Sequence, residues 1–148
     1  STLLLLQLGT ARSKARDAKR IADVNQIRSA AELYFDDNGQ YPSDPFNPTT
    51  VLVPNYITQI PKDPLTNTNY GYAYKDTSGK HLSFHIWAEM ELTGNWKSAD
   101  ADINSTLAGW TVAAPTAGRG TAVGATEACA NKDVSDADKE CIYDQGQN

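Results

Sequence analysis

Residues that build catalytic and metal centres are scarce in this sequence. Two histidines and two cysteines occur among 148 residues, and the cysteines do not follow the Cys-x-x-Cys or Cys/His spacings of zinc sites. The glycines within Gly118–Gly124 do not match the Gly-x-Gly-x-x-Gly spacing of a dinucleotide-binding loop. We therefore expect a structural protein rather than an enzyme, and calcium is the one cofactor that the sequence leaves open.

Long hydrophobic runs are also missing, and positive charge is in the minority. The longest aliphatic stretch falls far short of the roughly 18 residues that read as a membrane-spanning helix. Thirteen lysines and arginines stand against 18 aspartates and glutamates, for a formal net charge of -5. This balance disfavours a dedicated nucleic-acid-binding protein. A chain of this length fits a single domain.

What the sequence does have is a long helix, predicted over residues 1–38. Residues 9–38 contain no proline, and Asn38-Gly39 suits a helix C-terminus. In its second half, apolar residues recur at spacings of three and four, at Ile21, Val24, Ile27, Ala31 and Tyr34. This period predicts one buried stripe, so the second half of the helix should pack on a domain core.

The first half of this helix has a different surface. Leucines crowd its start, like the end of a longer apolar segment that precedes Ser1, and alanines then continue the helical spacing. Cations between Arg12 and Arg20 fit a solvated helix face, an acidic neighbouring subunit or, as an alternative, phosphates and anionic lipid headgroups. We expect the first half to be an assembly face, formed by Leu3, Leu4, Leu5, Leu6, Leu8, Ala11, Ala15 and Ala18.

The rest of the chain predicts an antiparallel sheet, and the fold class is therefore α+β. Residues 39–69 hold six of the seven prolines and should form an irregular connection. Residues 70–113 contain tyrosines at every second position, a turn at Asp76–Gly79, a second alternating strand over 82–90 and a third strand over 107–113. Phe84 and Ile86 should cover the helix stripe. Residues 114–148 read as a C-terminal loop region.

Two clusters could mimic functional sites. His81, His85 and Glu89 share one face of the second strand, which we interpret as a solvated polar face rather than an acid/base or metal cluster. Two groups of oxygen-bearing side chains are weak candidates for calcium sites. The alternative interpretation is that both are solvated acidic loops. The candidate ligands are Asp100, Asp102 and Asn104, followed by Asp133, Asp136 and Asp138.

Cys129 and Cys141 are predicted to form a disulfide. Eleven residues separate them, in a polar stretch without metal motifs, and such a pair indicates an oxidising compartment; two free thiols are the alternative. In the chain-entropy model, a loop of this size would be stabilised by roughly 3 kcal/mol. The mass of the unreduced protein should be two hydrogens below that of the reduced protein, whereas two alkylatable thiols in native material would contradict the prediction.

Three motifs occur in a recognisable order. The first is Ala11–Pro42, ARSKARDAKRIADVNQIRSAAELYFDDNGQYP; the second is Ile60-Pro61-Lys62-Asp63-Pro64 followed by Tyr70-x-Tyr72-x-Tyr74; the third is the C-terminal cysteine pair. In this order the sequence resembles the type IV pilin and type II secretion pseudopilin family, with its exposed half-helix, its Asn-Gly-x-Tyr-Pro exit and its Pro-x-Asp-Pro stretch. The resemblance extends to about Met90 and is loose beyond.

The resemblance implies a long helix laid on an antiparallel sheet and a structural role in a filament. It also implies a further apolar segment with a methylated N-terminus, which anchors the precursor in the cytoplasmic membrane and later packs at the filament centre. Implied partners are other copies of the chain, through the N-terminal helix, and a pilus or secretion assembly machinery. We expect a pilin of an extracellular, cell-surface filament. A major pseudopilin is the first alternative, and a secreted calcium- or carbohydrate-binding module is the second.

Overall fold

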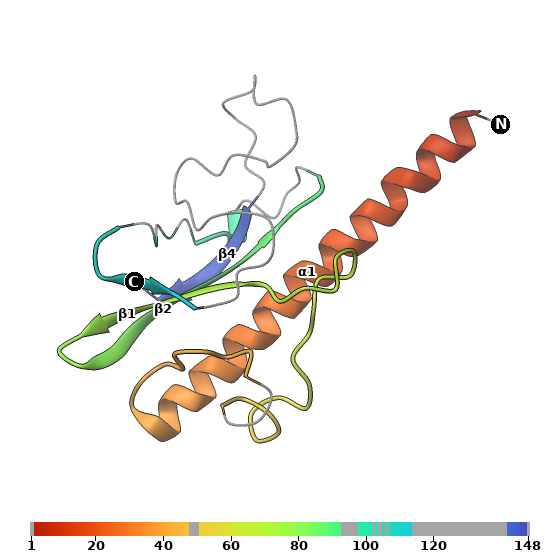
Figure 1. Cartoon of the computed structure of the whole chain (residues 1–148). Helices are drawn as coiled ribbons and strands as arrows, with labels where there is room; N and C mark the ends of the chain where they lie inside the picture. Colours follow the sequence, from red (N-terminus) through yellow and green to blue (C-terminus); the bar gives the residue numbers. More distant parts are fainter. Residues whose placement is uncertain are drawn as a thin grey trace.

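The computed structural model describes residues 2–47, 51–92, 98–101, 103, 105, 107–113 and 142–147 of the 148-residue chain. The long helix α1 (Thr2–Asn38) is followed by strands β1 (Gly71–Thr77), β2 (Lys80–Glu89), β3 (Trp110–Val112) and β4 (Ile142–Gln147). The fold is α+β: the second half of α1 packs on a four-stranded antiparallel sheet, a pilin-like topology. The first half of α1 extends well beyond the sheet (Figure 1). We call the sheet, the second half of α1 and the described part of residues 39–69 the head.

α1 ends where the sequence predicts. Gly39 has a positive φ of 67°, and its N–H donates to the Phe35 carbonyl at 2.7 Å. The Asn38 side chain donates to the Tyr34 carbonyl at 2.8 Å. A left-handed residue directly after the last helical turn satisfies carbonyls that have no partner within the helix. The chain can therefore turn back at Tyr41 toward the sheet.

The sheet has the strand order β3-β1-β2-β4. β1 and β2 form the predicted hairpin, in which Tyr72 is paired with Ile86 and Tyr74 with Phe84. The third strand, β3, is shorter than the predicted range 107–113: only Trp110–Val112 pairs with β1. The sequence predicted no strand after residue 113, yet Ile142–Gln147 forms β4 along the other edge of β2.

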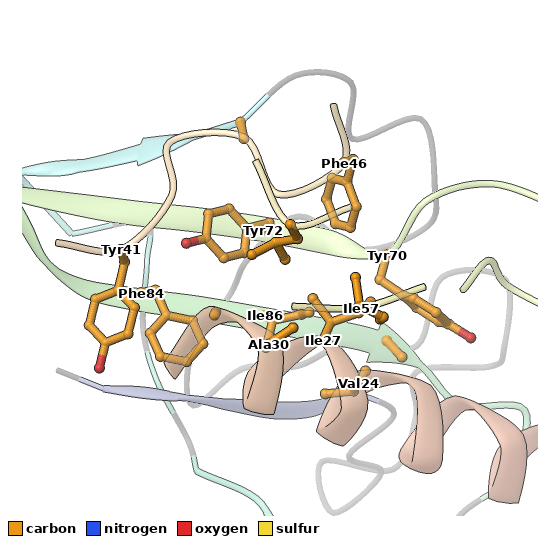
Figure 2. Packing of buried hydrophobic residues seen from close by; sticks show 14 of the residues in the cluster. Val24, Ile27, Ala30, Tyr41, Phe46, Ile57, Tyr70, Tyr72, Phe84 and Ile86 are labelled. Atoms are coloured by element: carbon orange, nitrogen blue, oxygen red, sulfur yellow. The ribbon is translucent and has the colours of Figure 1, made fainter. Parts of the chain in front are cut away.

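The main core lies between α1 and one face of the sheet. Ile27 and Ala31 are fully buried in the same cluster as Phe84 and Ile86, which confirms that the hairpin covers the helix stripe. Figure 2 shows Ile27 between the helix and β2, close to Ile86, and Val24 belongs to the same cluster. The connection also contributes, since Phe46, Leu52 and Ile57 belong to this cluster. The core is therefore closed by three elements rather than two.

The opposite face of the sheet was predicted to be solvated, and this is wrong. Trp87 and His85 of β2 are each 1% exposed, and Trp87 packs with Ala73 and Ile142 in a second cluster. The alternation of β2 is real, but both of its faces are buried. Polar residues on one face of a strand normally indicate that this face is solvated. When those residues are hydrogen-bonded inside the protein, the face can be buried, and the sequence does not show it.

Gly71 makes this second face sensitive to a single methyl group. A Cβ at Gly71 would lie 1.9 Å from the Trp87 ring, so Gly71→Ala would push the indole out of its buried position. We expect a loss of about 1–3 kcal/mol in the free energy of unfolding, measured by urea denaturation. Gly9→Ala is the matched control: nothing lies within 4 Å of its Cβ, and alanine in a helix should be neutral or slightly stabilising. Equal losses in both variants would contradict this packing.

Candidate functional site

The most distinctive surface of the protein is the first half of α1. Gln7, Leu8 and Ala11 are exposed, and so are Ala15 and Ala18. The backbone of residues 3–6 belongs to α1, while the side chains of Leu3, Leu4, Leu5 and Leu6 lie outside the described part of the structure. In the described residues, no helix is both long and apolar enough to cross a membrane. The described members of the predicted assembly face, Leu8, Ala11, Ala15 and Ala18, are thus left uncovered by the head.

A cluster of ion pairs joins α1 to the head at the point where the helix leaves it. Its centre is Arg20, which is only 2% exposed. The Arg20 guanidinium donates to Asp17 at 2.7 Å, to Glu91 at 2.7 Å and, through Nε, to Asp63 at 2.6 Å. Three carboxylates from three segments of the chain therefore converge on one buried cation.

Glu91 and Asp17 extend this cluster toward the N-terminus of α1. Arg16 forms a bidentate contact with Glu91, at 2.7 and 2.6 Å, and Ser13 donates to the same carboxylate at 3.0 Å. Asp17 accepts the backbone N–H groups of Glu91 and Leu92, each at 2.9 Å. We call this set (Ser13, Arg16, Asp17, Arg20, Asp63 and Glu91) the ion-pair clamp.

The clamp shifts the pKa values of its members. Hydrogen bonds from Arg16, opposed by partial burial but reinforced by Arg20 and Ser13, lower the pKa of Glu91 to about 2. Burial would raise the pKa of Asp63, but hydrogen bonds from Arg20 and from the Thr66 and Leu65 amides lower it to about 2. Burial opposes the charge of Arg20, and its three carboxylate partners nevertheless raise its pKa. All three groups are therefore held in their charged forms at neutral pH.

The clamp corrects the prediction for the cations between Arg12 and Arg20. Arg16 and Arg20 are bound by carboxylates of the same chain, so these two cations do not belong to a solvated face. Arg12 and Lys14 are exposed and form no salt bridge with any described residue. The head thus holds α1 from about Ser13 onward, and it fixes the direction in which the preceding turns project.

A second polar network lies on the far side of the sheet, around His85. One ring nitrogen of His85 is 2.7 Å from the Ser105 hydroxyl, and the other is 2.7 Å from an Asp144 carboxylate oxygen. Asp144 also accepts the N–H groups of Ala101 and Ile103, each at 2.8 Å. Its own N–H donates to the Asp100 carboxylate at 2.6 Å.

This network contains serine, histidine and aspartate in a row, but its environment is that of a structural tie. Ser105 is 3% exposed and Asp144 is 0% exposed, so the serine hydroxyl does not face solvent. Burial would raise the pKa of Asp144, and the hydrogen bond and charge of His85 lower it. The carboxylate accepts hydrogen bonds from two backbone amides and contacts His85, and so it ties Ala101 and Ile103 to β2 and β4. The sequence signal that could have indicated this network is the position of His85 among aromatic and aliphatic residues of β2.

The calcium and disulfide predictions fall mostly outside the described residues. Asp100 is described and belongs to the His85 network, whereas Asp102, Asn104, Asp133, Asp136 and Asp138 are outside the described part, as are Cys129 and Cys141. Where the structure is described, no group of three or more His, Cys, Asp or Glu side chains is arranged to hold a metal ion. These predictions stay untested.

Comparison with known proteins leaves the family open. No protein-family model matches the chain, and neither a curated protein nor a solved structure matches it significantly.

Proposed function

We propose that this protein is a pilin-like structural subunit that polymerises through α1 into an extracellular filament of the type IV pilus kind. The observation that carries the proposal is the asymmetry of α1. One face of its second half packs on the sheet, while its first half projects beyond the sheet (Figure 1). Small side chains of that first half, Ala11, Ala15 and Ala18, are exposed. A projecting helix of this length is poorly stabilised by itself in water, since most helical stability comes from packing.

The clamp supports the same role. A subunit that packs by a projecting helix needs that helix at a constant angle to the head, because each small error would accumulate along a polymer. Arg20 is bound by residues of α1, of the 39–69 connection and of the segment after β2. Small side chains at Ala11, Ala15 and Ala18 would then let a second helix approach closely, as small residues do at tight helix contacts.

The test uses the complete chain as its gene encodes it, expressed in its native cells. Ala15→Trp adds a large side chain to the exposed strip, and the clamp and the core leave that position free. We expect cell-surface filaments to be lost in electron micrographs, while the melting temperature of the head is unchanged. Gln59→Trp, on an exposed part of the connection, is the control and should retain filaments. Wild-type cells that produce the protein but no polymer would contradict the proposal.

A major pseudopilin is the second candidate, and one contact favours it. The Pro-x-Asp-Pro stretch resembles that of major pseudopilins. Its aspartate, Asp63, accepts hydrogen bonds from the Arg20 guanidinium and from the backbone amides of Leu65 and Thr66. In that case, deletion of the gene should block the export of a secreted protein, and surface filaments should be absent at normal expression. Filaments without any export defect would favour the pilin.

A further inference from the structure

Two pairs of like-charged, exposed side chains on α1 form no salt bridge with any residue that the structure describes. Near one end, Arg12 and Lys14 project from the free half of the helix without a described salt-bridge partner. Near the other end, Asp36 and Asp37 are exposed in the last turn. Asp37 accepts a hydrogen bond from the Tyr56 hydroxyl at 2.8 Å, and Asp36 forms no salt bridge with a described residue.

The acidic end works against the helix that carries it. The last turn of α1 contains no basic residue, and anionic side chains there face the negative end of the helix dipole, where cations would be stabilising. Asp37 gains only the Tyr56 hydrogen bond in return, and Asp36 has no salt bridge with a described residue, so the unfavourable charges point to a use outside the fold. The same region exposes Leu33 to 52%, although it lies in the half of α1 that otherwise packs on the head.

These residues lie on one outward face. At 3.6 residues per turn, about 100° per residue, Ala11, Ala15 and Leu33 fall near one line along α1, opposite the buried stripe. Arg12 and Lys14 lie on opposite sides of that line. Asp36 and Asp37 also lie on opposite sides of it, near Leu33. At each end of α1, two like charges therefore flank the line of apolar residues, with positive charges at one end and negative charges at the other.

We infer that these two ends bind each other between neighbouring copies, with parallel helices displaced along their axes by about 35 Å, which is 23 to 24 residues at about 1.5 Å each. This rests on the proposed function. When parallel helices face each other, opposite flanks meet, so Arg12 faces Asp36 of the neighbour and Lys14 faces Asp37. The two separations, 24 and 23 residues, are satisfied by one displacement. It also places Leu33 of one copy between Leu8 and Ala11 of the other.

The match is between two different patches, so the contact is heterologous. Such a contact leaves each copy with one patch of each kind unfilled, and repetition gives an open helical polymer rather than a closed dimer. An antiparallel pair would also bring the charges together. In that arrangement, however, Leu8 would lie beyond Asn38 at the end of the partner helix. The parallel displacement covers both large apolar side chains that α1 exposes among its described residues, Leu8 and Leu33.

Charge reversal tests this inference in the complete, natively expressed chain. R12E with K14E, and separately D36K with D37K, should each reduce the yield of sheared filaments about tenfold at low salt, since attraction at two pairs becomes repulsion. The quadruple variant should return the yield to within about twofold of wild type. Reversal of two exposed head lysines, K62E with K80E, is the control and should have little effect. High salt should narrow all these differences.

Outcomes separate the inference from the proposed function. If wild type forms filaments but the quadruple variant is no better than either double variant, the displacement is wrong and the pilin role stands. If wild type forms no filaments, both fail. A second measurement does not depend on the folding of the charge variants: a benzophenone side chain at position 33 should crosslink to residues 8–11 of another copy. Crosslinks to residues 15–18 would instead indicate the antiparallel pair and overturn the inference.

Discussion

Replacement of Ile27 by aspartate should unfold most of the head. The Ile27 side chain is 0% exposed, at the centre of the cluster that joins α1 to β1 and β2. Ile27→Asp removes an aliphatic side chain from a close-packed site and buries a carboxylate that no nearby cation of the cluster can neutralise. We expect a loss of about 4 kcal/mol or more in the free energy of unfolding, measured by chemical denaturation of the chain described here.

Gln26→Asp is the matched control for this change. It introduces the same side chain one position earlier, where α1 is exposed, and should alter stability by less than about 0.5 kcal/mol. Similar denaturation midpoints for the two variants would mean that the helix does not have one buried and one exposed face in solution.

The second large effect is expected at Arg20. Arg20→Met keeps much of the side-chain volume but removes the cation, and Asp17, Asp63 and Glu91 then share a site that has lost its central charge. Breaking a buried ion pair by removing one partner typically costs about 3–5 kcal/mol, which corresponds to a fall in melting temperature of about 10 °C. Lys19→Met, at a half-exposed neighbouring cation, should cost far less.

The Arg20 effect should also depend on pH. The pKa values of Asp63 and Glu91 are lowered to about 2 in the folded protein, below their ordinary values near 4. A lowered pKa means that these carboxylates stabilise the fold fully above about pH 5, and that the contribution is lost as the pH falls toward 2. The difference in stability between wild type and Arg20→Met should therefore shrink over that interval. A difference that stays constant down to pH 2 would show that the carboxylates do not depend on Arg20.

Local patterns were sufficient for the main elements of the fold. The spacing of Ile27 and Ala31, the Asn38-Gly39 terminus and the alternation of β2 predicted a long helix under a hairpin, and the structure confirms all three. Each of these signals is carried by residues within one or two turns, or on one strand. They are therefore legible without knowledge of distant contacts.

What the sequence did not reveal depends on long-range partners. The role of Arg20 is set by Asp63 and Glu91, which follow it by 43 and 71 residues. His85 reads as a solvated residue until Asp144, 59 residues later, is placed beside it. Local spacing therefore identified the projecting half of α1 as a candidate surface. It did not identify the ion-pair clamp that joins α1 to the head.

The contact between α1 and β4 affects how the chain folds. Arg28 of α1 donates to Gln145 of β4, and Asn25 donates to Tyr143, so the helix is completed by a strand that is synthesised 117 or 118 residues after these positions. Contacts this distant in sequence form slowly, because a large loop must close before they contribute. Until β4 docks, the outer edge of β2 is an open template for a strand from another chain. Docking of β4 covers that edge, so we expect the interval before it docks to be the one in which the newly made chain is most prone to strand-to-strand aggregation.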